Sequence, residues 1–127
     1  ELYISKIQPM TTVQKLKEQI KTNAEQVKIT KENNEELTDE DIIGTGMMIE
    51  LQLYNQIQSF TLVVKGDVNG DAQIKLSDMT KMNKYRLNKN TLEKFELLAG
   101  DVNEDDAVDF KDLVKINKYR LNKITEL

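Results

Sequence analysis

The chain has 127 residues and a formal net charge of −4, and it contains neither histidine nor cysteine. Disulfides, thiolate nucleophiles and sulfur or imidazole metal sites are therefore excluded, which leaves oxygen ligands that suit Ca²⁺ or Mg²⁺. The mild acidity disfavours nucleic acid as a partner, and no apolar run approaches the roughly 20 residues that insertion into a membrane requires.

The first half of the chain is predicted to form a small α+β domain. Because the chain begins with glutamate, we expect it to be a fragment of a longer protein. Alternating apolar and polar residues favour strands, and an apolar residue every three or four positions favours a helix. In chain order we expect a strand at 2–7, a helix at 11–22 and strands at 26–30, 44–54 and 60–64, which gives the order β-α-β-β-β over residues 1–65.

Local signals in this half predict a helix cap, a turn and a solvated loop. Thr11 and Gln14 have the spacing of a capping box, so Thr11 is expected to cap the helix. Gly-Thr-Gly at 44–46 is too short for a phosphate-binding loop and is interpreted as a turn. Five acidic residues have no alternating ligand pattern and no companion base, so they are interpreted as a solvated loop: Glu35, Glu36, Asp39, Glu40 and Asp41.

The second half contains an internal repeat. Residues 66–89 and 100–123 are offset by 34 positions and are identical at 14 of 24, including the whole of "NKYRLNK". Tetratricopeptide repeats have the same period, but each of those opens on an apolar helix. Here each copy opens with Asp and Asn and then becomes helical, so the repeat is interpreted as a duplicated loop followed by a helix.

Each copy can be aligned with the 12-residue EF-hand loop, which takes calcium ligands from positions 1, 3, 5, 7, 9 and 12. This alternate spacing turns the oxygens of a tightly curled loop towards one centre. The first loop offers side-chain oxygens and a seventh-position carbonyl from Asp67, Asn69, Asp71, Gln73 and Asp78. The second loop offers the corresponding set from Asp101, Asn103, Asp105, Ala107, Asp109 and Asp112. We therefore predict two calcium ions.

The first loop departs further from the EF-hand pattern than the second. The sixth position requires a positive φ and is usually Gly, but here it is Ala72 in one loop and Asp106 in the other. Ala in that conformation costs about 1 kcal/mol or more, whereas Asp tolerates it better. Lys75, at the ninth position, cannot bind a cation, so we expect the first site to be the weaker. The eighth residues, Ile74 and Val108, are expected to pair in a short β-bridge.

The segments that enter the two loops are predicted to differ. An ordinary EF-hand has a helix on both sides of its loop, but residues 59–66 are strand-like. Only the second loop is expected to follow a helix, at 90–100, with Asn90 as its N-cap. Matching apolar positions in the two copies predict the core of this half: Met79, Met82, Tyr85, Leu87, Leu113, Ile116, Tyr119 and Leu121.

Two loop–helix motifs with Asp at the twelfth position and a short helical connector resemble the dockerin modules of bacterial cellulosomes, over roughly residues 66–125. The resemblance implies an all-α, non-catalytic domain over 66–127, with F-hand motifs held by two calcium ions. As a monomer it would dock onto a cohesin of a scaffold or cell-surface protein. It would be extracellular, either secreted or attached to the cell surface, and would anchor an upstream enzyme or scaffold.

The same resemblance implies which residues recognise the cohesin. They are the tenth and eleventh loop positions and the outer face of the following helix: Leu76, Ser77, Asn83, Lys84, Asn88, Phe110, Lys111, Asn117, Lys118 and Asn122. Leu76 and Phe110 are either exposed anchors or members of the core. Because the tenth and eleventh positions differ between the copies, we expect one preferred orientation rather than two equivalent ones.

Residues 1–65 resemble, by position and company alone, the X modules that often accompany dockerins and stabilise them or extend the contact with cohesin. No linker rich in Ser, Thr or Pro separates the halves, so we expect them to pack together. The alternative function is an EF-hand calcium sensor that binds a target helix, which the strand-like segment before Asp67 disfavours. A hydrolase that uses paired carboxylates is a weaker alternative, because those carboxylates are assigned to the loops.

Overall fold

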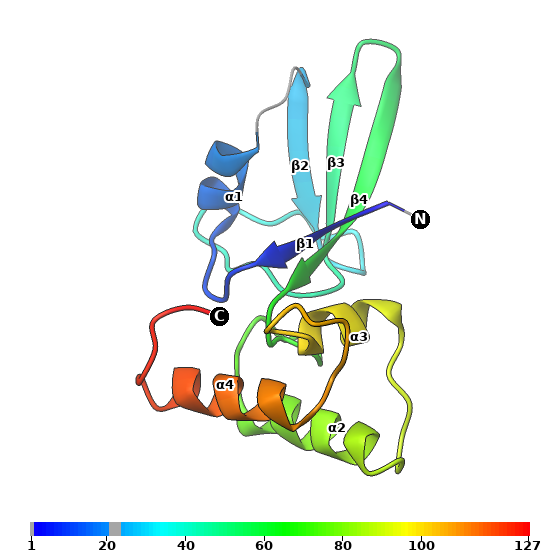
Figure 1. Ribbon diagram of the computed structural model, residues 1–127. Helices are drawn as coiled ribbons and strands as arrows, with labels where there is room; N and C mark the ends of the chain where they lie inside the picture. Colours follow the sequence, from blue (N-terminus) through cyan, green and yellow to red (C-terminus); the bar gives the residue numbers. More distant parts are fainter. Residues whose placement is uncertain (1, 21–23) are drawn as a thin grey trace.

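The computed structural model describes residues 2–20 and 24–127, and it contains a mixed sheet with one helix above a group of three helices (Figure 1). The sheet is built from the first half of the chain and the helical group from the second. The predicted order β-α-β-β-β of the first half is confirmed, although several of its element boundaries differ from the prediction.

The elements of the first half are β1 (Tyr3–Ile7), α1 (Val13–Gln19), β2 (Gln26–Thr30), β3 (Met48–Leu53) and β4 (Gln56–Val64). The strands lie in the order β1-β4-β3-β2, with β1 parallel to β4 and the other neighbours antiparallel. Strands β3 and β4 form a hairpin in which Leu53 pairs with Gln56. β4 begins four residues before the predicted strand, because its pairing with β3 continues to the hairpin turn.

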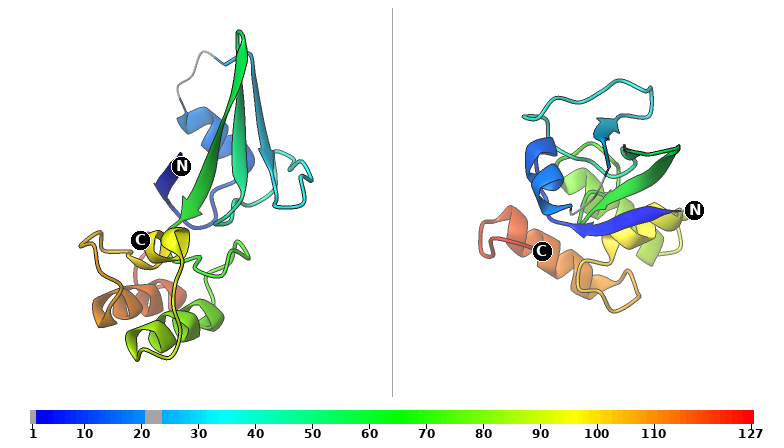
Figure 2. Two further views of the ribbon diagram at one scale, coloured as in Figure 1. Left: turned by 90° about the vertical axis from the view of Figure 1, so that its right-hand side faces the viewer. Right: turned by 90° about the horizontal axis from the view of Figure 1, so that it is seen from above.

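Helix α1 lies against one face of the sheet (Figure 2), where Val13 and Leu16 are buried with Ile29, Ile49 and Leu62. The predicted cap at Thr11 is wrong. Thr12 is the N-cap, and its side chain accepts a hydrogen bond from the Lys15 N–H, while the Thr11 hydroxyl donates to the Gln8 carbonyl. The helix ends at Gln19, and positions 21 and 22 of the predicted helix lie outside the described residues.

The second half contains α2 (Leu76–Arg86), α3 (Lys94–Gly100) and α4 (Phe110–Arg120). Helices α2 and α4 lie side by side and run in opposite directions, with α3 between them and the sheet (Figure 1). Met82, Leu113 and Ile116 are buried in this second core, as predicted. Leu87 and Leu121, also predicted to be core, are instead 47% and 54% exposed, because each lies one residue beyond the end of its helix.

Two further predictions in this half are wrong. Asn90 does not cap α3, which begins later, with Glu93 at its N-cap; the Asn90 side chain donates to the Lys81 carbonyl. Ile74 and Val108 form no β-bridge in the described part of the chain, and both side chains pack against the second core. Each eighth loop residue therefore packs into the helical core instead of pairing with the other loop.

The two halves pack together, as expected from the missing linker. The last two residues of β4 belong to different cores, since Val64 is buried in the first and Val63 in the second. Lys65 follows directly and is only 6% exposed; its ammonium group donates to the Leu127 carbonyl at 2.8 Å and to the Glu104 carboxylate at 3.2 Å. The position of the domain boundary after Lys65 remains a prediction.

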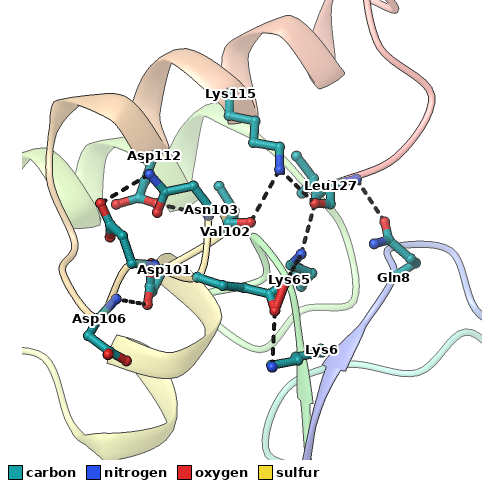
Figure 3. A network of polar contacts seen from close by, with 12 residues as sticks. Lys6, Gln8, Lys65, Asp101, Val102, Asn103, Asp106, Asp112, Lys115 and Leu127 are labelled. Carbon is teal, nitrogen blue, oxygen red and sulfur yellow. Dashed lines mark hydrogen bonds and ion pairs between the residues drawn. The ribbon is translucent and has the colours of Figure 1, made fainter.

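The end of the chain is also held against both halves, as Figure 3 shows. The Leu127 N–H donates to Gln8 in the first half at 2.7 Å, and the Lys115 ammonium group donates to the Leu127 carbonyl at 2.9 Å. Lys6 at the end of β1 forms an ion pair with Glu104 at 3.0 Å. These contacts tie the segment after α4 to the strand edge of the first half.

Candidate functional site

The two loops gather carboxylates as the repeat predicts. Asp67, Asp71 and Asp78 each offer an oxygen that lies within 4.8 Å of the other two, and the corresponding residues of the second loop do the same: Asp101, Asp105 and Asp112. In both loops the fourth and sixth residues have positive φ, which produces the tight curl. The sixth residues, Ala72 and Asp106, have φ values of 66° and 68°, as expected from the EF-hand alignment.

Main-chain N–H groups orient the carboxylates in the same way in both loops. Asp78 accepts from the Asn69 N–H at 3.1 Å and from the Lys75 N–H at 2.9 Å. Its counterpart Asp112 accepts from the third and ninth residues of the second loop at 3.3 and 2.9 Å. Each twelfth-position Asp thus joins the beginning of a loop to the first turn of the following helix, which its negative charge also stabilises.

Buried oxygens without hydrogen-bond partners indicate that the loops fit a cation. The Asp67 Oδ1 and Asn103 Oδ1 atoms are buried, and neither accepts a hydrogen bond from the residues that the structure describes. An unpaired buried oxygen is costly, and more so when it carries charge. Both atoms belong to predicted ligand positions, one in each loop, and hard oxygen ligands of this kind suit calcium.

Burial also raises the pKa values of these carboxyl groups. The pKa of Asp67 rises from the usual 3.8 to about 6, mainly because the group is buried, against the opposing effect of hydrogen bonds from Thr45 and Ala72. Burial raises the pKa of Asp112 to about 6 as well, and it raises the pKa of Asp78. Without a cation, the folded protein therefore resists full ionisation of both loops.

This predicts opposite pH dependences for the calcium-free and calcium-loaded protein. Because the pKa values of Asp67 and Asp112 are higher in the folded than in the unfolded chain, folding takes up protons between pH 4 and 6. Calcium-free protein should therefore melt at a higher temperature at pH 5 than at pH 7. In saturating calcium the order should reverse, since protons compete with the ion. Thermal unfolding in the four conditions measures this, and a calcium-free Tm that falls on acidification would contradict it.

The left-handed Ala72 leads to a second prediction. Replacing Ala72 with Gly removes the penalty of a Cβ atom at φ 66° and should stabilise the calcium-loaded protein by about 1 kcal/mol. Urea unfolding in excess calcium measures the change. Asp106→Gly is the matched control in the second loop, where the gain should be smaller because Asp tolerates this conformation better. An equal or larger gain at Asp106 would show that Ala72 is not the strained position.

The loops differ at the ninth position. Lys75 adds no oxygen to the first carboxylate cluster, and its ammonium group forms an ion pair at 3.7 Å with Asp71, a member of that cluster. Asp109 occupies the same place in the second loop, and its carboxylate accepts from the Lys111 N–H at 3.0 Å and caps α4. The Asp109 carboxylate keeps further lone pairs that can bind a cation, whereas the Lys75 side chain has no acceptor atom. Direct ligation by Asn69, Asn103, Asp109 and the carbonyls of Gln73 and Ala107 remains a prediction.

Five of the ten residues predicted to bind a partner line a groove between α2 and α4. The groove has a volume of about 550 Å³ and is mostly apolar. Leu76 and Phe110, which the sequence left open as anchors or core, are 60% and 63% exposed at its edges. Three more predicted contact residues line it: Asn83, Lys84 and Asn117.

The other predicted contact residues are exposed outside the groove: Ser77, Asn88, Lys111, Lys118 and Asn122. Asn88 and Asn122 have φ values of 60° and 59°, so they occupy the left-handed positions that follow α2 and α4. Asn adopts the left-handed conformation more readily than most other residues, which explains why Asn occurs at both helix ends.

Equivalent side-chain pairs occur on α2 and α4, the two helices beside the groove. Arg86 donates to Asn83 on α2, and Arg120 donates to Asn117 on α4, both at 2.8 Å. Arg86 also lies over the ring of Phe110, 5.8 Å from its centre, whereas Arg120 approaches the sulfur of a methionine on the opposite helix. The two halves of the groove are therefore related but not equivalent.

Sequence reasoning missed the contacts that join the first half to the loops. Thr45 donates its N–H to Asp67 at 2.9 Å, and Glu104 accepts from Lys65 and Lys6. These hydrogen bonds hold the pKa of Glu104 below its usual value. The sequence predicted a turn at 44–46, but no short-range pattern indicates that a main-chain N–H in this turn contacts a residue 22 positions later.

Comparison with known proteins identifies the second half of the chain. No helix in the described ranges has the length and apolar character needed to cross a membrane. No curated protein and no solved structure matched the chain. A family model did match: residues 65–122 fit the dockerin type I domain, a range that contains both loops, all three helices of the second half and the groove. The C-terminal part of this chain is a dockerin type I module.

Proposed function

We propose that the chain is a non-catalytic, calcium-dependent module that docks onto a cohesin through the α2–α4 groove. The observation that carries this proposal is the exposed, mostly apolar groove flanked by the tenth residue of each calcium loop, Leu76 and Phe110. Exposed apolar patches on small proteins mark interaction sites, and aromatic residues are frequent anchors. The module would tether an upstream enzyme or scaffold in an extracellular multiprotein complex, with residues 1–65 acting as an X-like companion domain.

The position of the anchors supports a dependence on calcium. Leu76 lies two residues before Asp78, and Phe110 lies two residues before Asp112. Both aspartates are fully buried and hold the first turn of a helix through main-chain hydrogen bonds. A cation bound by these carboxylates would therefore fix the helix ends from which the anchors project.

The unequal anchors support one preferred binding orientation. Phe110 offers more apolar area than Leu76, and the Arg86 guanidinium group lies over its ring, 5.8 Å from the centre. Rigid aromatic anchors lose little conformational entropy on binding. We propose that the Phe110 side of the groove makes the stronger contact with the cohesin.

Two calcium ions are proposed, one for each loop, and titration of single variants separates them. Calorimetry of the parent protein should give two binding events, with the second loop binding more tightly. Asp67→Ala should remove the weaker event and Asp101→Ala the tighter one, because each residue supplies the first ligand of its loop. A single event in the parent protein that survives Asp67→Ala would show that the first loop does not bind calcium.

The calcium-sensor alternative gains no support from the fold. A sensor opens its groove when calcium arrives, through the movement of two helices around each loop. Here strand β4, rather than a helix, leads into Asp67. A sensor would increase the fluorescence of an apolar dye on addition of calcium, whereas a docking module would not.

The direct test of docking is calorimetric titration of the calcium-loaded protein with a panel of cohesins. At least one should form a one-to-one complex. Failure of every cohesin type to bind the calcium-loaded protein would contradict the proposed function.

A further inference from the structure

The first carboxylate of the first loop is held by a turn of the other domain. Asp67 is fully buried, and its Oδ2 atom accepts two hydrogen bonds, one from the Ala72 N–H at 3.0 Å and one from the Thr45 N–H at 2.9 Å. Its Oδ1 atom is buried and accepts no hydrogen bond within residues 2–20 and 24–127. One oxygen is thus fixed by main-chain donors, and the other remains available as a ligand.

The second loop provides an internal comparison. Asp101 accepts from the N–H groups of Asp105 and Asp106 at 3.1 and 2.8 Å, so both of its oxygens are bonded within its own loop. In the described part of the chain, no residue of the first half donates a hydrogen bond to Asp101. The first half does contact this loop, but through Glu104 at the fourth position, which is not a predicted ligand.

The turn that supplies the Thr45 N–H is itself fixed by the sheet. The Thr45 hydroxyl accepts from the Val64 N–H at 3.0 Å and donates to the Val64 carbonyl at 3.3 Å. The Gly46 N–H donates to the Leu62 carbonyl at 2.9 Å. Both partners lie near the end of β4, three and five residues before Asp67, so the same strand positions the donor and its acceptor.

The contact leaves no room for a larger residue. A Cβ atom at Gly44 would lie 3.2 Å from the Asp67 carboxylate and 3.1 Å from the Ala72 nitrogen. From the other side, a Cβ atom at Gly70 would lie 2.8 Å from the Thr45 carbonyl. Main chain therefore packs directly on main chain between the turn and the loop.

We propose that the turn at 44–46 is a positioning element of the first calcium site, so that calcium affinity in this loop depends on the N-terminal domain. The loop that receives this hydrogen bond from the N-terminal domain is the one with Ala72 in a left-handed conformation and Lys75 in place of a ninth ligand. In the second loop, the first ligand position accepts hydrogen bonds from its own loop, and no described residue of the first half donates to it. This inference rests on the proposed calcium-binding role of the loops.

The test uses the full chain, with a calcium titration followed by NMR at two amides. The N–H groups of Ala72 and Asp106 occupy equivalent positions, and each reports on its own loop. Gly44→Ala, which crowds Asp67 directly, should weaken calcium binding at the first loop by about tenfold or more, the usual loss when a residue that orients a ligand is changed. Binding reported by Asp106 should change by less than about twofold.

A milder variant and a matched control keep the test decisive if Gly44→Ala does not fold. Thr45→Val removes the hydroxyl that holds the turn to Val64 and should weaken the first loop selectively. Thr11→Val removes a hydroxyl that bonds Gln8 in the same domain and keeps the Thr11 carbonyl that accepts from the Ile43 N–H beside the turn, so it should alter calcium binding at neither loop. Hydrogen exchange of the Thr45 N–H should slow in calcium.

The possible failures can be separated from one another. The inference would be overturned if the variants weakened calcium binding equally at both loops, or if folded Thr45→Val bound calcium at the first loop as tightly as the parent. Either result would leave the proposed function intact. Absence of calcium binding to either loop of the parent protein would overturn both.

Discussion

Removal of calcium is expected to lower the Tm of this protein by more than about 10 °C and to loosen the packing of α2 against α4. A ligand that binds only the folded state adds about 4 kcal/mol per site when its concentration is a thousand times Kd. For a chain of this size, each kcal/mol corresponds to a few degrees of Tm, roughly 3–5 °C.

The reason lies in the buried carboxylates. Asp67, Asp78 and Asp112 have no exposed surface, and each lies near other carboxylates of its own loop. At neutral pH the calcium-free loops must either hold like charges together or take up protons, as the raised pKa values of these groups indicate. Differential scanning calorimetry in calcium and after treatment with a chelator measures the effect.

Magnesium is the matched control for this experiment, because it has the same charge but requires a smaller, octahedral set of ligands. It should restore less of the lost Tm than calcium does at the same concentration. If the Tm is the same with calcium and with chelator, the loops do not bind an ion in the folded state, and the calcium role assigned to them is wrong.

Replacement of Phe110 by Ala is expected to cause the largest loss of cohesin affinity among single changes in the groove. An aromatic hot-spot residue typically contributes about 2–4 kcal/mol, which corresponds to roughly a 30- to 1,000-fold weaker Kd. Because Phe110 is 63% exposed, the substitution removes little from the core and should leave the Tm almost unchanged. Leu76→Ala should have a smaller effect, since Leu76 offers less apolar area.

Tyr54→Ala is the control for the loss of an exposed aromatic ring. Tyr54 lies at the tip of the β3–β4 hairpin, in the other half of the chain, and is 86% exposed. Its replacement should leave cohesin affinity unchanged when measured by the same calorimetric titration. A Phe110→Ala variant that binds as tightly as the parent, or a stronger effect of Leu76→Ala, would contradict the preferred orientation proposed for this groove.

The sequence predicts the loops well because their geometry is local. Ligand spacing and the positive φ at Ala72 and Asp106 follow from a 12-residue pattern that needs no distant contact. The order of helix and strands along the first half of the chain was predictable for the same reason, since local apolar periodicity distinguishes a strand from a helix. The sequence could not predict how β1 would pair, because its parallel contact with β4 joins positions almost 60 residues apart.

The errors concern positions where tertiary context decides between neighbouring residues. Thr11 and Thr12 are both good N-caps, and the pairing of Thr12 with Ile42 accompanies the later start. Leu87 and Leu121 continue an apolar pattern, but each helix ends one residue earlier, so their side chains remain exposed. An apolar periodicity predicts which side of a helix a residue lies on only for residues within that helix.

The contacts between the two halves of the chain change the comparison between the two calcium loops. On sequence alone, the first loop is simply the poorer copy. Within the described residues, Thr45 gives Asp67 a donor from the first half that Asp101 does not have, and Lys65 links Glu104 of the second loop to Leu127. Val63 and Val64 place the end of one strand in both cores, which explains how the state of one half can affect the other.

Light scattering during size-exclusion chromatography can show whether calcium-loaded loops present the α2–α4 groove to a cohesin. The protein is mixed with a cohesin in calcium, and the mixture is then treated with chelator. We expect a single species with the mass of a one-to-one complex in calcium and two separate species in chelator, with recovery of the complex when calcium returns. A complex that persists in chelator would show that docking does not depend on calcium.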